Sequence, residues 1–353
     1  MESSQGQLPS FGALVISLDF ELHWGVRDKK TPDGSYRQNL LGARLAIPRL
    51  LDLFEEFEVA ATWATVGFLF AECRGQREEF SPRLRPEYAD AKLNAYSEPT
   101  GESENDDPLH YGLGLIRQIG ERARQELATH TFSHYYCLER GETREAFAAD
   151  LQSAMAIGRH HGIDLRSIVF PRNQFRPGYE DLLRAVGIVC YRGTESNWMY
   201  RPRPRGEETL AVRAPRLLDN YISLSGPNLT RWDEVMQPNG LCDVPSSMFL
   251  RPYSPQWKNF EPVRLSRLTA GVQAAAEQGK IFHLWWHPHN FGTQTDENLQ
   301  FLRGALEAFS GCRRKHGMKS LSMLEAANLV RNSAAVMPVV QREAVRVSRE
   351  QIL

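Results

Sequence analysis

The stretch Ala13-Leu-Val-Ile-Ser-Leu18 is a short apolar run, and its composition predicts a buried β-strand. A polar segment follows it, and then Leu45 to Phe57 repeats apolar residues at helical spacing. A strand followed by a helix is the repeating unit of α/β proteins with parallel sheets. The beginning of the chain therefore predicts an α/β fold.

The same alternation continues along the chain. Further stretches with the composition of strands are Val59–Val66, Glu126–Thr129, Ser167–Phe170, Ile188–Tyr191, Thr209–Arg213 and Lys280–Trp286. About seven strands alternating with helices predict a single-domain, distorted (β/α)7-type barrel, a fold that commonly uses a chain of this length. We expect the barrel to occupy residues 1–332 and a peripheral C-terminal tail to occupy residues 333–353.

One segment interrupts this pattern. Ser81 to Gly112 is rich in Pro, Glu, Asp, Asn and Ser, and it is longer than most connections in a compact fold. It predicts a long surface insertion near the mouth of the site.

The bulk composition excludes several classes of function. The 353 residues include 42 Lys and Arg against 43 Asp and Glu, a formal net charge of −1. No overall positive field therefore exists to attract nucleic acid or an anionic membrane surface. No window resembles a membrane span, and Met1 to Ser10 lacks the features of a secretory signal. We expect a cytoplasmic protein with no nucleic-acid partner and no membrane span; the sequence does not indicate its oligomeric state.

The most specific feature is Glu126-Leu-Ala-Thr-His130-Thr-Phe-Ser-His134, in which a predicted strand runs into two histidines four residues apart. In a helix this spacing places both imidazoles on one face, where they can share a metal ion at about 2.0–2.1 Å from each nitrogen. Ten histidines in 353 residues give roughly 0.3 such pairs by chance, so the strand-end context is what gives the pair weight.

A second pair with the same spacing serves as a comparison. His283 and His287 lie in a predicted strand, where four residues span roughly 13 Å, too far to share one ion. We expect His283 to be a buried core histidine with a hydrogen-bond partner.

Acidic residues occur at the end of the first predicted strand, in Leu18-Asp19-Phe20-Glu21-Leu22-His23. Alternation along a strand would place Asp19, Glu21 and His23 on one face. A solvated strand end with a helix cap is the alternative, but strand ends of βα barrels are where catalytic groups lie.

An arginine follows another predicted strand, in Val169-Phe170-Pro171-Arg172-Asn173. Arg172 could orient a carboxylate through a bidentate pair of hydrogen bonds. Arg176, farther from the strand end, fits a surface turn better.

The last predicted strand ends in Trp285-Trp286-His287-Pro288-His289. A histidine at this position could donate a proton to a leaving amine, and His287 is favoured over His289 because a strand end is held more rigidly than a loop. For Trp285 and Trp286, packing in the core is favoured over stacking on a sugar ring.

Taken in order, these motifs resemble the polysaccharide deacetylase family, also called the NodB-homology or carbohydrate esterase family 4 group. The correspondence covers roughly Val15 to Phe291. Asp19-Phe-Glu21 is similar to the family's aspartate motif, Ala61-Thr-Trp-Ala-Thr to its "ATFF" strand, and His130 to His134 to its double-histidine motif. Arg172 and His287 match its arginine motif and its final strand-end histidine.

The resemblance implies a distorted barrel and a divalent metal, with zinc as the expected ion, held by Glu21, His130 and His134. It also implies removal of N-acetyl groups from a sugar or saccharide precursor, in surface polysaccharide biosynthesis. Asp19 would act as base, Arg172 would fix Asp19, and His287 would be the acid. The family usually has two adjacent aspartates, whereas one residue intervenes here, so whether Asp19 or Glu21 is the ligand stays open, as do contributions from His289 and His23.

Two other functions stay open. The same barrel and metal site could serve a hydrolase of small amides, such as a deformylase or an allantoinase-like enzyme. A catalytically decayed carbohydrate-binding protein is the alternative from another class, although the retained histidines argue against it.

Overall fold

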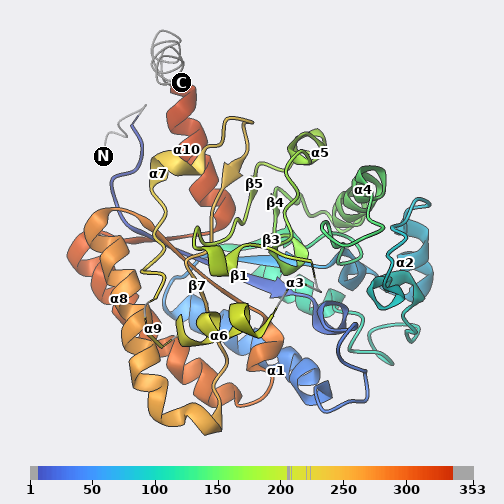
Figure 1. The fold of residues 1–353 in the computed structure, drawn as a ribbon, viewed down its shortest axis with the longest axis horizontal. Coiled ribbons are helices and arrows are strands. Elements are labelled where there is room, and N and C mark those ends of the chain that lie inside the picture. The colour runs from blue at the N-terminus through green and yellow to red at the C-terminus, as the bar shows by residue number, and fades with distance from the viewer. Residues whose placement is uncertain (1–6, 205–206, 208, 220, 223, 337–353) are drawn as a thin grey trace.

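The structure is a computed structural model, and it describes residues 7–204, 207, 209–219, 221–222 and 224–336. Its centre is one sheet of parallel strands that curls into an incomplete barrel (Figure 1). The strand order is β6-β5-β4-β3-β2-β1-β8-β7, and β9 pairs with β1 beside this path. The strands are β1 (Ala13–Phe20), β2 (Ala61–Thr65), β3 (Gln125–Thr129), β4 (Ser167–Ile168), β5 (Cys190–Tyr191), β6 (Cys242–Asp243), β7 (Met248–Phe249), β8 (Ile281–Trp286) and β9 (Lys319–Leu321). The predicted distorted barrel is confirmed.

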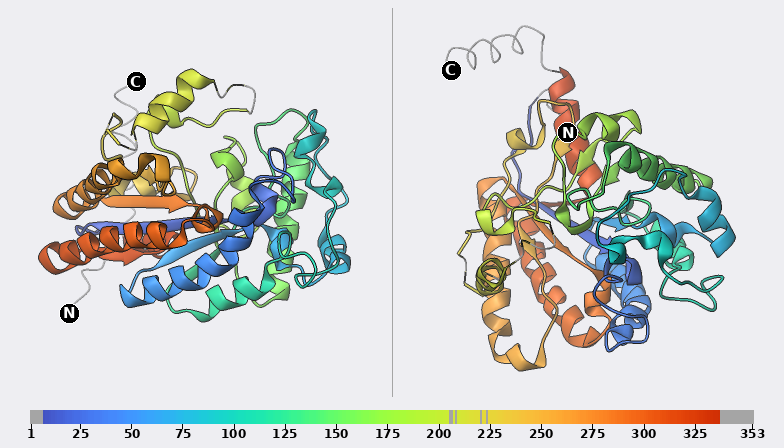
Figure 2. Two further views of the ribbon diagram at one scale, coloured as in Figure 1. Left: turned by 90° about the horizontal axis from the view of Figure 1, so that it is seen from below. Right: turned by 45° about the vertical axis from the view of Figure 1, so that its right-hand side comes forward.

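Helices surround this sheet (Figures 1 and 2). They are α1 (Arg37–Glu56), α2 (Arg74–Phe80), α3 (Leu113–Glu121), α4 (Arg144–His160), α5 (Glu180–Ala185), α6 (Leu210–Asp219), α7 (Trp232–Val235), α8 (Glu261–Gln278), α9 (Thr295–His316) and α10 (Met323–Val336). The long helices α8 and α9 lie side by side, and α9 also contacts α1. None of the helices in the described ranges is both long enough and apolar enough to cross a membrane.

Strand β1 is the centre of the sheet. It pairs with β8 on one side, and on the other side with β9 along Ala13–Val15 and with β2 along Ser17–Phe20. All eight of its residues are buried. Parallel strands covered on both faces are nearly continuously apolar, which explains why the pattern of this strand is the clearest in the sequence. The apolar stripe of α1 packs against this core through residues such as Ile47, Leu50 and Phe54.

One continuous segment bridges the two edges of the sheet. Val244 donates its backbone N–H to the carbonyl of Tyr191, which belongs to β5, at 2.9 Å. Three residues later, Ser247 donates to the carbonyl of His283, which belongs to β8, at 2.8 Å. The two short strands β6 and β7 therefore lie on opposite sides of the barrel opening, and the chain between them narrows it.

The predicted strand at Thr209–Arg213 is wrong, because the backbone there enters α6 at Leu210. Its apolar residues resemble those of a strand over a short window, and periodicity does not separate the two over such a length. The structure adds β6, β7 and β9, which are two or three residues long and too short to show alternation. Helix α10 continues past Ser333, and the remainder of the predicted tail, residues 337–353, lies outside the described residues.

Candidate functional site

The carboxyl ends of several strands bring polar side chains together at one end of the barrel. Asp19 lies in β1 and Glu21 directly follows it, while His130, Arg192 and His287 each come immediately after β3, β5 and β8, respectively. Parallel strands end at the same edge, so residues far apart in the sequence converge there.

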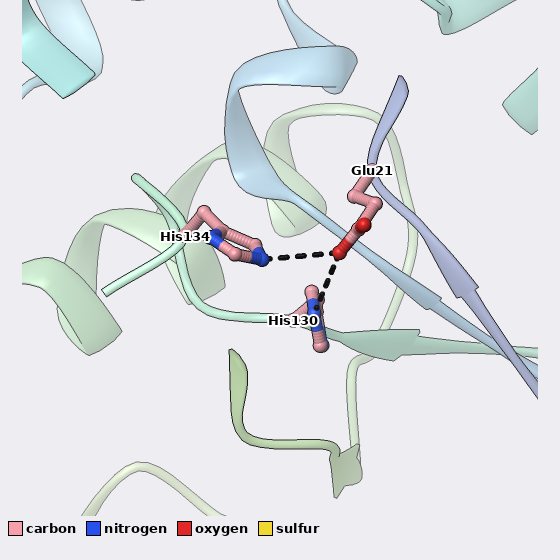
Figure 3. Close-up of side chains that lie close together, drawn as sticks. All are labelled: Glu21, His130 and His134. Atoms are coloured by element: carbon pink, nitrogen blue, oxygen red, sulfur yellow. Dashed lines mark hydrogen bonds and ion pairs between the residues drawn. The ribbon is translucent and has the colours of Figure 1, made fainter. Parts of the chain in front are cut away.

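Glu21, His130 and His134 form a compact cluster of possible metal ligands (Figure 3). The Oε2 atom of Glu21 lies 3.3 Å from Nε2 of His130 and 3.0 Å from Nε2 of His134. A tetrahedral ion with bonds of about 2.0–2.1 Å has ligand atoms about 3.3–3.4 Å apart. All three side chains are buried, and their spacing fits a divalent cation.

The two histidines do not lie on a helix, contrary to the geometry that their spacing suggested. Thr131 and His134 have positive φ angles of 64° and 57°, so the segment is a tight loop. Asp150 of α4 holds this loop by accepting backbone hydrogen bonds from Phe132 at 2.7 Å and from Ser133 at 3.0 Å. The loop, rather than a helical turn, brings both imidazoles to Glu21.

The hydrogen bond of His130 fixes which of its nitrogens can bind a cation. Its Nδ1 lies 2.8 Å from the carbonyl oxygen of Val169, which can only accept, so Nδ1 carries the proton. Its buried Nε2 has no hydrogen-bond partner and presents a lone pair toward the acceptor oxygen of Glu21. A ring nitrogen whose opposite nitrogen donates to a carbonyl is the arrangement found in metal-ligating histidines.

Glu21 is held ionised in a confined space. Burial alone would raise the pKa of Glu21, but the neighbouring His287, His130 and His134 outweigh burial and hold that pKa well below its usual range. Position 25 is glycine because a Cβ atom there would lie 1.9 Å from the Glu21 carboxylate. The glycine lets the chain after β1 turn tightly over this side chain.

Asp19 is paired with Arg192. The guanidinium donates to both carboxylate oxygens, at 2.7 and 2.8 Å, and also to Ser17 and Asn173 at 2.9 Å each. Burial alone would raise the pKa of Asp19, but the charge and hydrogen bonds of Arg192 outweigh it and lower that pKa. Asp19 is therefore a carboxylate at neutral pH, beside the cluster of Glu21 but not within it.

The predicted contact between Arg172 and Asp19 is wrong. Arg172 instead forms an ion pair with Asp28, and its other terminal nitrogen lies 3.7 Å from Glu139. Its φ is 55°, in the turn after β4. Sequence analysis missed Arg192, although it directly follows the predicted strand Ile188–Tyr191 and so occupies the position expected for a site residue.

His287 lies above the two carboxylates. Its Nε2 is 3.6 Å from Oε1 of Glu21 and 3.9 Å from Oδ2 of Asp19, and its side chain is 23% exposed. His289 stacks beside it with ring centroids 5.0 Å apart but is buried, and burial lowers the pKa of His289 to about 3. His283 is the core histidine that was predicted, bonded to Val244 and Ser17.

His23 does not share the site of Asp19 and Glu21. Strand β1 ends at Phe20, and Leu22 with a φ of 44° begins the 3-10 helix η1 (Leu22–Gly25). The alternation assumed from the sequence stops there, and the His23 ring contacts His110 instead.

A cavity of about 690 Å³ opens over these residues. Asp19, Glu21, His134 and His287 lie at its base, and Trp285 is part of its wall whereas Trp286 is buried in the core. The rest of its lining is formed by Gly25, Val26, Lys29, Arg172, Asn173, Glu195, Tyr200, Pro202, Arg203, Arg216, Phe249, Arg251, His289 and Asn290. No residue of the insertion Ser81–Gly112 lines it, so the predicted place of that insertion at the mouth is wrong.

The mouth is instead walled by the segment between β5 and α6. This segment contributes Glu195, Tyr200 and Arg203, and α6 contributes Arg216. In Figure 2, left, α6 projects from the barrel on the side opposite α1 and α3.

The sequence matches no family model and no curated protein. Solved structures share its fold. The "putative polysaccharide deacetylase" of Mycobacterium smegmatis superimposes with a TM-score of 0.60 at 14% identity, covering 96% of both chains. The "probable polysaccharide deacetylase" of Pseudomonas aeruginosa PAO1 gives a TM-score of 0.52 at 11% identity over 90% of both chains. Puue allantoinase gives 0.52 at 10% identity over 93% of both chains.

These similarities establish the fold. The chain has the NodB-homology fold of polysaccharide deacetylases, which is also the fold of an allantoinase. Because one fold supports different reactions, the function has to be argued from the site.

Proposed function

We propose that this chain is a metal-dependent hydrolase that removes an N-acetyl group from a sugar precursor, in surface polysaccharide biosynthesis. One observation carries the proposal: a possible metal cluster of Glu21, His130 and His134 lies beside an ionised Asp19 at the base of one cavity. The His287 side chain lies over both carboxylates.

The donor set supports zinc as the ion. Two imidazole nitrogens and one carboxylate oxygen are the protein ligands typical of catalytic zinc sites. A divalent ion bound there supplies a more acidic water and polarises the amide carbonyl. The unpartnered Nε2 of His130 and the ionised Glu21 are the groups in the chain that would hold it.

Asp19 would accept a proton from the attacking water. Arg192 occupies both of its oxygens and keeps it charged, so Asp19 is available as a base at neutral pH. His287 would donate a proton to the departing amine, since it is the more exposed of the two stacked histidines that line the cavity.

The cavity supports a sugar substrate that carries a negative charge. Trp285 and Phe249 pack with ring centroids 4.7 Å apart and offer an aromatic wall to the apolar face of a sugar ring. Lys29, Arg203 and Arg251 also line the cavity. Basic side chains favour a phosphate group, so we propose a phosphate-linked or diphosphate-linked N-acetyl sugar as the substrate.

The fold shared with an allantoinase favours a small cyclic amide as the second candidate substrate. A cavity of about 690 Å³ is within the range that accommodates ligands larger than such a molecule. The aromatic and basic wall has no evident role for a small neutral amide.

The test is acetate release from free and nucleotide-diphosphate-linked N-acetyl sugars, with allantoin and an N-formyl amine as comparison substrates. We expect hydrolysis of a linked sugar, loss of activity after chelation, and recovery with one equivalent of zinc per catalytic site. If the enzyme hydrolysed allantoin and none of the sugars, the proposed sugar substrate would be wrong. Activity that is unchanged in His134→Ala would disprove the proposed site.

A further inference from the structure

A second cluster of possible metal ligands joins the turn after β1 to the insertion Ser81–Gly112. His23 and His110 are buried, and Glu98 lies beside them with 18% of its side chain exposed. His23 belongs to η1, only two residues after Glu21, whereas Glu98 and His110 belong to the insertion Ser81–Gly112. None of the three side chains lines the cavity.

The spacing of this second cluster fits one ion. His23 Nδ1 lies 3.0 Å from His110 Nε2, and Oε1 of Glu98 lies 3.4 Å from the first and 3.8 Å from the second. The ligand atoms of a tetrahedral zinc ion lie about 3.3–3.4 Å apart, close to the middle of these three distances.

The outward nitrogens of both histidines are already occupied. His23 Nε2 lies 3.1 Å from the carbonyl oxygen of Lys30, and His110 Nδ1 lies 2.8 and 2.9 Å from the two oxygens of Asp107. The carbonyl and the carboxylate accept, so these ring nitrogens carry the protons. When both rings are neutral, the nitrogens that face each other present two lone pairs at 3.0 Å beside the negative Glu98, and either a metal cation or a shared proton between them relieves the repulsion.

This arrangement also has the outer partners of a metal site. The second ring nitrogen of a ligating histidine usually donates to a carboxylate or to a backbone carbonyl. Here His110 has the carboxylate partner and His23 has the carbonyl partner. Asp107 is itself fixed, since it accepts the backbone N–H of Gly101 at 2.8 Å.

We propose that His23, Glu98 and His110 bind a divalent transition-metal ion, with zinc as the preferred ion, at a structural site separate from the catalytic one. Asp107 is a positioning residue that orients His110. The second oxygen of the partly exposed Glu98, or a water, would complete the coordination. The proposal does not depend on the proposed deacetylase function.

The role of such an ion would be to tie the insertion to the turn that carries Glu21. Hydrogen bonds already join the same two segments: His23 donates its backbone N–H to Leu109 at 3.1 Å, and the Trp24 indole donates to the His110 carbonyl at 2.9 Å. An ion would add a third and stronger link, two residues along the chain from Glu21.

The test is the zinc content of purified full-length protein, measured by elemental analysis after dialysis against a weak chelator. We expect two ions per chain in the wild type, one in His134→Ala, one in His110→Gln and none in the double variant. His160→Gln, which alters an exposed histidine of α4, should keep two. Asp107→Asn should weaken binding at the second site by about 10–100-fold.

Cobalt provides a measurement that does not depend on the stability of His110→Gln. In His134→Ala, one equivalent of Co²⁺ should produce the visible absorption bands of a tetrahedral site, and these bands should be lost at limiting cobalt when Asp107→Asn is added to the same His134→Ala variant. If His134→Ala binds neither zinc nor cobalt, the facing nitrogens share a proton and the proposal is wrong. If His110→Gln alone loses metal while His134→Ala keeps the wild-type content, the second site stands and the catalytic one fails.

Discussion

Arg192 donates to both carboxylate oxygens of Asp19, at 2.7 and 2.8 Å, although 173 positions separate the two residues in the sequence. Both are buried, so removing either leaves the other charged group without its partner. The arginine is also fixed from other sides, by Ser17, by Asn173 and by the ring of Trp285, whose centroid lies 4.1 Å from the guanidinium carbon.

Arg192→Gln should lower kcat and move the acidic limb of the pH profile toward higher pH. The charge of Arg192 lowers the pKa of Asp19 against the opposing effect of burial, so its removal raises that pKa and protonates the base at a higher pH. Each unit by which the pKa of Asp19 rises lowers the fraction of enzyme with an ionised Asp19 about tenfold at pH values below that pKa. The measurement is kcat against pH, with metal content and melting temperature recorded for the same samples.

Arg172→Gln is the matched control, since Arg172 also lies near the cavity but pairs with Asp28. It should leave the acidic limb in place. Arg192→Lys keeps a positive charge and should move the acidic limb less than Arg192→Gln does. If Arg172→Gln moves the acidic limb and Arg192→Gln does not, the assignment of the arginine is wrong.

Asp19→Asn should keep the metal and lose turnover, because the amide preserves the shape of the side chain but cannot accept the proton. Losses of about 10²–10⁴-fold are typical for a general base. Glu21→Gln should instead lose metal, because the Glu21 oxygen lies at 3.0 and 3.3 Å from the two histidine nitrogens. The opposite result, with metal lost only in Asp19→Asn, would exchange the two roles.

His287→Ala should cost more activity on an acetamide than on an activated acetyl ester. An amine leaves only as its nitrogen is protonated, whereas an activated ester needs no such proton. His289→Ala is the comparison variant, because its ring stacks on His287 but is buried. Equal losses on both substrates would remove the proton-donor role from His287, and a larger amide-specific loss in His289→Ala would transfer the role to His289.

Glu195 should make the protein less stable as the pH rises from about 4.5 to 7. Burial raises the pKa of Glu195 to about 7, against the opposing effects of Ser246, Arg192 and Arg216. In this pH window the folded state binds more protons than the unfolded state, so the free energy of unfolding falls as the pH rises, by at most about 3 kcal/mol for a group with this pKa change.

Glu195→Gln should remove this part of the pH dependence. The free energy of unfolding of the variant, relative to that of the wild type, should therefore be higher at pH 8 than at pH 5. The measurement is the urea midpoint at both pH values, with an unchanged dependence on urea concentration. If the urea midpoint changes equally between pH 5 and pH 8 in the wild type and in the variant, Glu195 is ionised in the folded protein at both pH values.

The sequence by itself determined the parts of the molecule that depend on local pattern. The apolar run of β1 was visible because buried parallel strands are nearly continuously apolar. The strand that leads into His130 is more polar, and the two histidines that follow it drew attention to it. Since parallel strands all end at one edge, the order of strands and helices was enough to predict that the polar residues after them, among them Glu21 and His287, converge.

The tertiary structure decided what depends on the exact direction of side chains beyond the strand ends. Two arginines follow neighbouring strands, and only the backbone conformation of each turn makes Arg192, rather than Arg172, face Asp19. In the same way, the start of η1 turns His23 away from Glu21 and toward the insertion. A turn of a few residues sets such a direction, and its conformation depends on packing against segments that are distant in the sequence, so local periodicity contains no information about it.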